Sequence, residues 1–363
     1  MTWTDIDWAA LDRLRGRFLR GAAGHEAYWT SPGDLANYDF TFGERIGWKW
    51  DAVFRELDLR GWKPSCAAMF DREHPSASVD RSGPAVLDWG CGSGVAGRRV
   101  VRWLGADRVA VLRVWDRSAL AAGFAAGAAH ACFPGLTVEQ LTPGFFAGNE
   151  PIGVLVISHV LNELPAGDLR ALRGLASRAS VILWVEPGTP EVSRALIEIR
   201  EQLRGRYRLI APCTHQAECG LLASAHARHW CHHFAAPPPA IFADSNWVKF
   251  GQRAGIDLRS LPYSFLALER TARGPAPAGA ADLARVIGEA RVYKGFAKVL
   301  SCDAAGVREL TLQKRDAPEL LRELRRPANP LVVHWTREGD KVVGGELLPG
   351  LRGHGSNWVE RRA

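Results

Sequence analysis

The sequence has 363 residues, of which 47% are hydrophobic and 23% charged, and a formal net charge of +7, which predicts a globular protein with one sizeable core and a second smaller one. No apolar run approaches the roughly 20 residues that cross a bilayer, and the first residues lack the pattern of an export signal or transit peptide, so we expect a soluble cytoplasmic protein with no membrane partner. Its seven cysteines are an odd number, which argues against a disulfide framework and favours metal or redox chemistry.

The first 80 residues predict a helical N-terminal extension. Residues 11–20 have apolar side chains at helical spacing and a basic face, and residues 48–57 also have the pattern of an amphipathic helix. Either helix could contact RNA, although a solvated basic face on a packing helix is the commoner arrangement.

From residue 81 to residue 273 the sequence predicts an α/β domain. Short apolar runs alternate with helical segments at residues 94–104 and 166–177, and this alternation is typical of a parallel sheet covered by helices on both faces. Ligands bind such sheets beyond the carboxyl ends of the strands. The predicted strands are residues 85–88, 109–115, 154–157, 181–185, 208–211 and 265–269, and we expect the last to return to the sheet.

The strongest local motif is a glycine loop between the first predicted strand and the following helix. Asp88 ends the strand, and Gly90, Gly92 and Gly94 follow at alternate positions, which lets the chain turn sharply and lets a ligand approach the backbone. The loop also fits the dinucleotide pattern. However, Asp88 would repel a pyrophosphate, whereas it suits the positively charged methionine part of S-adenosylmethionine (SAM). Asp116, at the end of the second strand, could bind the ribose hydroxyls of either cofactor.

The motif Asp88-x-Gly90-x-Gly92-x-Gly94 resembles the first motif of class I SAM-dependent methyltransferases. This resemblance covers residues 80–270 and implies a Rossmann-like, seven-stranded sheet whose last strand is antiparallel. The segment after the fourth strand lacks the Asn/Asp-Pro-Pro-aromatic signature of enzymes that methylate exocyclic amines. His159 or Glu163 could act as a base there, but capping or packing is the commoner role. The catalytic residues are therefore left unknown, and enzyme activity is left open.

Three cysteines lie close together in the segment 211–235, which we interpret as an insertion in the α/β domain. Cys213, Cys219 and Cys231 could supply three ligands of a soft-metal site. The spacing leaves zinc and a [4Fe-4S] cluster both open, because zinc accepts three cysteines and a histidine, whereas the cluster prefers four cysteines. Free buried thiols are the alternative, and they are the expectation for Cys66, Cys91 and Cys132. Candidates for the fourth ligand are Cys302, His215, His226, His229, His232 and His233.

The residues around these cysteines resemble the methyltransferase-like family associated with assembly of the small ribosomal subunit in mitochondria and bacteria. The resemblance rests on Pro212-Cys213-Thr214-His215, on Cys219, on Trp230-Cys231-His232-His233-Phe234 and on residues 185–190. It implies a [4Fe-4S] cluster, in preference to zinc, held by Cys213, Cys219, Cys231 and Cys302. Thr214 and Gly220 stand where the family has proline, and His233 interrupts the Trp-Cys-His-Phe pattern, so the chain resembles a divergent member.

Residues 281–363 predict a small basic β-rich module, which a Pro- and Gly-rich linker at residues 274–280 separates from the rest. Residues 271–363 carry 16 Lys and Arg against 11 Asp and Glu, compared with 30 against 28 in residues 1–270. Such an excess suits an anionic partner such as RNA. Because Cys302 lies beyond the linker, the cluster would join the two domains as a structural element.

Together, these features predict a SAM-binding methyltransferase-like protein that acts in small-subunit assembly and translation through contact with rRNA, with ribosomal proteins as a further class of partner. One alternative is an active RNA or small-molecule methyltransferase with a structural zinc site. A second is a non-catalytic RNA-binding assembly module whose glycine loop is vestigial. A dinucleotide oxidoreductase fits least, because Asp88 and the cysteines have no role in it.

Overall fold

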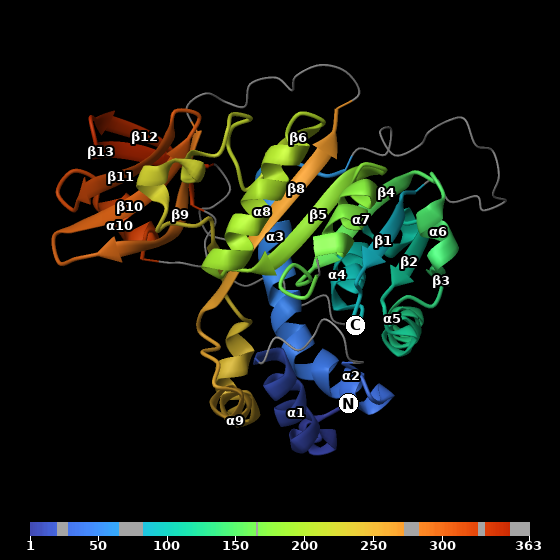
Figure 1. Cartoon of the computed structure of the whole chain (residues 1–363). Helices are drawn as coiled ribbons and strands as arrows, with labels where there is room; N and C mark the ends of the chain where they lie inside the picture. Colours follow the sequence, from blue (N-terminus) through green and yellow to red (C-terminus); the bar gives the residue numbers. More distant parts are fainter. Residues whose placement is uncertain (20–27, 65–82, 165, 272–282, 326–330, 349–363) are drawn as a thin grey trace.

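The computed structural model describes residues 1–19, 28–64, 83–164, 166–271, 283–325 and 331–348. They form a mixed sheet with helices on both faces and a closed five-stranded barrel beside it (Figure 1). The α/β class and the β-rich C-terminal module are thus confirmed. Within this part of the chain, every helix is too short or too polar to span a bilayer. The predicted linker at 274–280 and Cys66 lie outside the described residues.

The sheet has the strand order β3-β2-β1-β4-β5-β8-β6, in which β8 alone is antiparallel to its two neighbours, β5 and β6. This order, with one late reversed strand, is the fold expected from the class I methyltransferase motif. The strands on this path are β1 (Ala85–Trp89), β2 (Val111–Trp115), β3 (Thr137–Gln140), β4 (Ile152–Ser158), β5 (Ala179–Pro187), β6 (Tyr207–Ala211) and β8 (Leu261–Arg270).

The expected count of seven strands is corrected to eight. The additional strand, β7 (His233–Ala235), pairs with the first residues of β8. A strand of three residues is too short to produce a periodic sequence pattern. The edge strand β3 was also missed, because three of its four residues are exposed and it lacks an apolar run.

Alternate residues of the strands point to opposite faces of the sheet, and each face has its own hydrophobic core. Val86 and Val154 pack with the N-terminal helix α3 and with α4 and α5, whereas Leu87 and Leu155 pack with α7 and α8. The short helix α6 follows β3. The helices around the sheet are α3 (Glu44–Leu59), α4 (Val95–Leu104), α5 (Ala119–Cys132), α6 (Pro143–Ala147), α7 (Ala166–Ala176) and α8 (Pro190–Leu203).

The expected helical N-terminal extension is present and contacts a helix from much later in the chain. Helix α1 (Trp8–Leu19) lies beside α9 (Ser245–Ala254), and α2 (Pro32–Tyr38) lies next to α1, at one end of the molecule (Figure 1). Trp3 packs edge-on against Trp247, with ring centroids 5.0 Å apart, and its indole N–H donates to Asp244 at 2.9 Å. Aromatic packing therefore joins the N-terminal extension to a late helix of the α/β domain.

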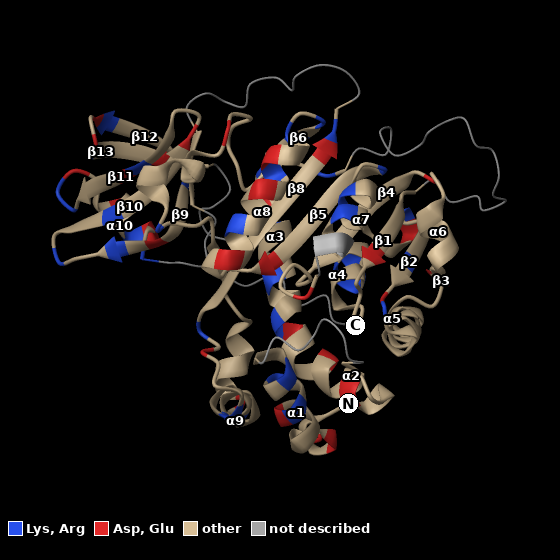
Figure 2. Ribbon diagram, in the orientation of Figure 1, with Lys and Arg blue, Asp and Glu red and all other residues tan. Residues whose placement is uncertain are grey.

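The barrel closes in the order β10-β11-β13-β12-β9, around an apolar core that includes Val299, Leu312 and Val333. Basic and acidic residues are mixed along its strands and turns, with Lys and Arg at the outer ends of several strands (Figure 2). Its elements are β9 (Leu283–Val292), β10 (Phe296–Asp303), β11 (Gly306–Gln313), α10 (Pro318–Glu323), β12 (Val332–Glu338) and β13 (Lys341–Leu347).

Candidate functional site

The glycine loop has the backbone conformation that its sequence predicts. Gly90, Gly92 and Gly94 have φ angles of 69°, 52° and 77°, a region in which side chains are strained. A Cβ on Gly94 would lie 2.7 Å from the Cβ of Ala125, and one on Gly90 would lie 2.9 Å from Val160. The loop is therefore held closely between α5 and the segment that follows β4.

Asp88 is buried at the carboxyl end of β1 with half of its carboxylate unpaired. Its side chain is 0% exposed, Oδ2 accepts the backbone N–H of Gly97 at 2.9 Å, and Oδ1 has no hydrogen-bond partner. Burial raises the pKa of Asp88 to about 7. An unpaired buried carboxylate oxygen is costly on its own and is satisfied by a cationic or hydrogen-bonding ligand.

Asp116 follows β2 and supports the loop directly. Its Oδ2 accepts the N–H of Gly92 and its Oδ1 accepts the N–H of Ser118, each at 2.9 Å. Burial raises the pKa of Asp116 above its ordinary value. Each oxygen retains one lone pair. The predicted contact with a ribose stays a prediction, to which the structure adds a role in fixing the loop.

Two basic side chains of α3, Arg45 and Lys49, which the sequence did not single out, lie near the candidate base His159, just after β4. His159 has a left-handed φ of 57°, and its Nε2 lies 3.1 Å from Nζ of Lys49 on α3. Burial lowers the pKa of Lys49 to about 7 and that of His159 well below its ordinary value. One turn earlier on α3, Nε of Arg45 is buried without a hydrogen-bond partner. In the sequence, the position of Lys49 between Trp48 and Trp50, both of which are buried, could have indicated that this lysine is buried too.

Buried glutamates lie close to the same segment. Glu186, at the end of β5, accepts the indole N–H of Trp184 at 2.7 Å and the backbone N–H of Val160 at 3.2 Å. Burial raises the pKa of Glu186 to about 8 and that of Glu163 to about 7. Glu186 therefore holds the segment between His159 and Glu163 in place, in agreement with a mainly structural role for that segment.

The four predicted cysteine ligands come from two domains: three from the α/β domain and one from the barrel. Cys213 follows β6, Cys219 precedes a short 3-10 helix, η6 (Gly220–Leu222), and Cys231 precedes β7. Cys302 lies in the barrel strand β10. The chain thus approaches this region from the sheet and from the barrel.

The structure brings these four cysteines close together. Cys219, Cys231 and Cys302 pack in one apolar cluster with Leu221 and other residues of both domains. Burial, and after it the charge of Cys213, raises the pKa of each of these three thiols, to about 11 for Cys219. These electrostatic effects indicate that Cys213 is near each of the others.

Cationic and imidazole groups surround the same cysteines. Nε of Arg200 lies 3.4 Å from Sγ of Cys213, and the side chain of Arg200 is 1% exposed. Nε2 of His215 lies 3.5 Å from Sγ of Cys302, and Nε2 of His233 lies 3.8 Å from Sγ of Cys231. The cations Arg200 and Arg285 oppose the rise in the pKa of Cys231. Positive charge of this kind suits thiolates that share a metal centre.

The placement of these side chains does not by itself form a metal site. Among the described residues, no three His, Cys, Asp or Glu side chains are grouped closely enough to hold a metal ion. A single zinc ion would require sulfurs about 3.8 Å apart, given its bond length of about 2.3 Å to sulfur. A [4Fe-4S] cluster spreads its thiolates more widely, because each binds a different iron. Four neighbouring cysteines fit that group by donor type.

Arg60, which follows α3, fixes the backbone that carries Cys213. Its Nη1 donates to the carbonyl oxygens of Ile210 and Cys213 at 3.0 Å each, and its Nη2 donates to that of Pro212 at 2.8 Å. The N-terminal extension therefore positions a candidate ligand in the later insertion.

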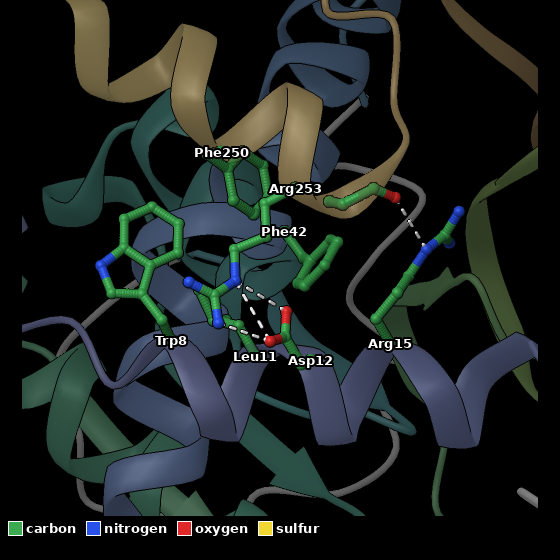
Figure 3. Close-up of a pocket in the computed structure, with 8 residues that line it drawn as sticks. Trp8, Leu11, Asp12, Arg15, Phe42, Phe250 and Arg253 are labelled. Carbon is green, nitrogen blue, oxygen red and sulfur yellow. Dashed lines mark hydrogen bonds and ion pairs between the residues drawn. The ribbon is translucent and has the colours of Figure 1, made fainter.

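A pocket between α1 and α9 offers less chemistry. Figure 3 shows Arg253 and Asp12 paired across it, with hydrogen bonds of 2.6 to 3.1 Å. Trp8, Leu11 and Phe250 line it as well. Because Asp12 neutralises Arg253 and Arg15 donates to a backbone carbonyl, we interpret the pocket as a packing seam between helices.

Comparisons with known proteins identify a family for half of the chain. A family model described as mitochondrial small ribosomal subunit Rsm22 matches residues 145–328. No curated protein matches the sequence.

Solved structures match only distantly. A magnesium protoporphyrin IX methyltransferase from Synechocystis is 14% identical and covers 73% of this chain and 95% of its own, with a TM-score of 0.36. An rRNA methylase from Streptococcus thermophilus is 13% identical and covers 58% of this chain and 97% of its own, with a TM-score of 0.31. The strand order, and not these matches, carries the fold assignment.

Proposed function

The chain belongs to the Rsm22 family of the mitochondrial small ribosomal subunit, and from this premise we propose that it binds SAM and acts in assembly of the small subunit through contact with rRNA. The observation that carries SAM binding is the unpaired Oδ1 of Asp88, buried beside three glycines in left-handed conformations. The proposed cofactor residues are those predicted from the motif, namely Asp88, Gly90, Gly92, Gly94 and Asp116.

The charges around the loop suit the two ends of the methionine part of SAM. Asp88 is the acidic group available to its ammonium and sulfonium charges. Arg45 and Lys49 are available to its carboxylate. Lys49 contacts His159, and the residue after His159, Val160, packs closely against Gly90 of the loop. Neither cation forms an ion pair within the described part of the chain. Buried cations without acidic partners are stabilised by an anionic ligand.

Calorimetry with the full-length protein tests this proposal. We expect SAM and S-adenosylhomocysteine to bind with one site per chain. An absence of binding to both would instead support the alternative of a vestigial glycine loop.

We propose that Cys213, Cys219, Cys231 and Cys302 hold a [4Fe-4S] cluster with a structural role. The group would share the buried guanidinium of Arg200 with Glu201 and link the insertion to the barrel through Cys302. Zinc remains the alternative metal. Anaerobic purification followed by iron, sulfide and zinc analysis decides between them, since zinc without sulfide would contradict the cluster.

An active methyltransferase is the second candidate function, and Lys49 favours it. With a pKa of about 7, this lysine is partly unprotonated at neutral pH and could accept a proton from a methyl acceptor. Methyl transfer from labelled SAM to small-subunit rRNA would support it. If no label is transferred to the rRNA, SAM binding without methyl transfer would be the function supported.

The family supplies the proposed partner and leaves the location as a prediction. Association with the small ribosomal subunit follows from the family description, with rRNA and ribosomal proteins as its two candidate components. That description also names mitochondria, so the cytoplasmic location expected from the sequence remains untested. Sedimentation of the tagged protein with small subunits, checked in each compartment, tests both points.

A further inference from the structure

The barrel has the connectivity of an oligonucleotide-binding (OB) fold. Strands β9, β10 and β11 form an antiparallel meander, β11 pairs in parallel with β13, and β12 pairs antiparallel with both β13 and β9. Helix α10 lies between β11 and β12 in the chain. In OB folds, the face formed by the second and third strands and the loops after the first and fourth strands bind oligonucleotides or oligosaccharides.

The inner half of that face is already covered in this protein. Leu300 and Cys302 of β10, with Val307 of β11, pack against Ile197 and Leu221 of the α/β domain. A ligand on this barrel is therefore limited to the outer half, near the turn between β9 and β10.

The outer half presents a flat aromatic surface. Phe296 and Lys298 of β10 face the same side as their partners Gln313 and Thr311 on β11, opposite to the buried core residue Val299. Tyr293, in the turn, stacks on Phe296 with ring centroids 4.4 Å apart and an angle of 15° between the planes. Tyr293 is 46% exposed. One side of this aromatic pair is consequently available to a planar ligand.

Positive side chains surround the aromatic pair. The N–H of Lys314 donates to the carbonyl of Gly295 at 2.9 Å, which brings the end of β11 beside the turn that carries Lys294. Lys294 and Lys314 are exposed and form no ion pair within the described residues. Glu309 lowers the local charge by pairing with Lys298 at 2.8 Å and with Arg291.

The distribution of charge, and not its total, supports an anionic ligand here. Residues 283–325 and 331–348 carry 11 Lys and Arg against 9 Asp and Glu, so the barrel as a whole is nearly neutral. Lys294 and Lys314 lie next to the outer ends of β10 and β11, where Figure 2 shows basic residues. This position next to the exposed ring of Tyr293 favours nucleic acid over an oligosaccharide.

We propose that the outer half of the barrel face, centred on Tyr293, Phe296, Lys294 and Lys314, binds single-stranded RNA. An unpaired base stacks on the exposed ring of Tyr293, and the neighbouring phosphates contact the two lysines. Bases within a duplex cannot reach a ring at the tip of a turn, so the site selects single strands. The inference rests on the proposed contact with rRNA and names the surface and the form of RNA involved.

Fluorescence anisotropy of the full-length protein with a labelled 12-nucleotide oligouridine tests the site. We expect Tyr293→Ala to weaken binding by about 5- to 100-fold. Phe242→Ala, which removes a 55% exposed ring far from the barrel in sequence, is the matched control and should bind as the unaltered protein does. A Lys294→Ala/Lys314→Ala variant should lower the slope of log K against log salt by about 0.7 for each lost phosphate contact.

The outcomes separate this inference from the proposed function. If the unaltered protein binds oligouridine but Tyr293→Ala and the double lysine variant bind equally well, the surface is wrong while RNA contact stands. Tighter binding of a 12-base-pair duplex than of oligouridine also overturns the site. If the unaltered protein binds neither RNA nor small subunits, the proposed function fails first. Thermal unfolding of each variant confirms that binding is compared between folded proteins.

Discussion

Glu56 of α3 forms a buried ion pair with Arg285 of β9, 229 residues later in the chain. The two side chains are 1% and 4% exposed, and Glu56 also accepts from Arg60 at 2.8 Å. Since Arg60 in turn holds the backbone at Cys213, one network connects the N-terminal helix, the cysteine insertion and the barrel.

Glu56→Ala should destabilise the protein by about 3–5 kcal/mol, because it leaves buried guanidinium groups without their carboxylate. Glu319→Ala, which removes a 75% exposed partner of Arg322, should cost less than about 0.5 kcal/mol. Thermal and urea unfolding measure both. Equal effects of the two substitutions would show that the buried pair contributes nothing.

The same pair predicts a loss of stability in acid. Burial alone would raise the pKa of Glu56, but Arg285 and Arg60 lower it below its ordinary value of 4.5. Because the folded pKa lies below the unfolded one, the stabilisation is complete above the unfolded pKa and disappears as the pH falls through the folded pKa. The unfolding free energies of the unaltered protein and Glu56→Ala should therefore converge in acid.

Gly97→Ala should weaken SAM binding and destabilise the protein, since the new Cβ would lie 2.7 Å from Oδ2 of Asp88. Gly127→Ala is the matched control in α5, where a Cβ would meet nothing within 4 Å. That substitution should stabilise the protein by about 0.5–1 kcal/mol, because alanine is the better helix former. Calorimetric titration and thermal unfolding of both variants provide the comparison.

The ionisation of Asp88 should raise the affinity for SAM as the pH increases, while the loss of charge on Lys49 in the same range opposes it. Its pKa of about 7 means that the carboxyl loses its proton between pH 6 and 8, and the cationic cofactor favours the ionised form. We expect an increase in affinity of up to about tenfold over this range. Without ligand the sign is opposite: because the folded pKa is raised, Asp88 lowers stability as the pH increases from the unfolded value towards 7. A pH-dependent affinity that is unchanged in Asp88→Asn would assign the effect to another group.

Cys302→Ser should remove iron and sulfide from the purified protein, from about four iron atoms per chain to nearly none. Cys132→Ser should retain them, because Cys132 lies outside the candidate site and is exposed, which corrects the expectation of a buried thiol there. Elemental analysis and the visible spectrum report the result. Full iron content in Cys302→Ser would make His215, 3.5 Å from that sulfur, the next candidate ligand.

Phe250→Ala should cost about 3–5 kcal/mol, because the ring is 1% exposed in the seam between α1 and α9. Phe242→Ala, at a ring 55% exposed, should change the free energy of unfolding far less. If both have the same small effect, the N-terminal helices do not depend on the packing seam shown in Figure 3.

Features that depend on neighbouring residues in the sequence were predicted. Features that depend on contacts between residues far apart in the sequence were not. Buried parallel strands such as β4 consist of continuous apolar residues, so the α/β class was confirmed. The sharp turn of the loop was expected from its three glycines, and their left-handed φ angles came from the structure. By contrast, the connectivity of the barrel depends on which strands pair, and alternation along a strand does not specify its partner.

The environment of the candidate site was also hidden from the sequence. Lys49 lies within a predicted helix, and only the fold places it 3.1 Å from His159, 110 residues later. Arg60 likewise has no motif that would connect it to Cys213. The convergence of four cysteines could be proposed from family resemblance, whereas the guanidinium of Arg200 beside them required the structure.

The position of β8 constrains how this protein can fold as it is synthesised. Strands β5 and β6 are not neighbours, since each pairs with β8, which begins only at residue 261. Until that strand leaves the ribosome, β5 has an unpaired edge and β6 has no partner in the sheet. Exposed strand edges on nascent chains promote aggregation. Stalled or truncated chains that end before residue 261 should accordingly depend on chaperones, however complete their glycine loop.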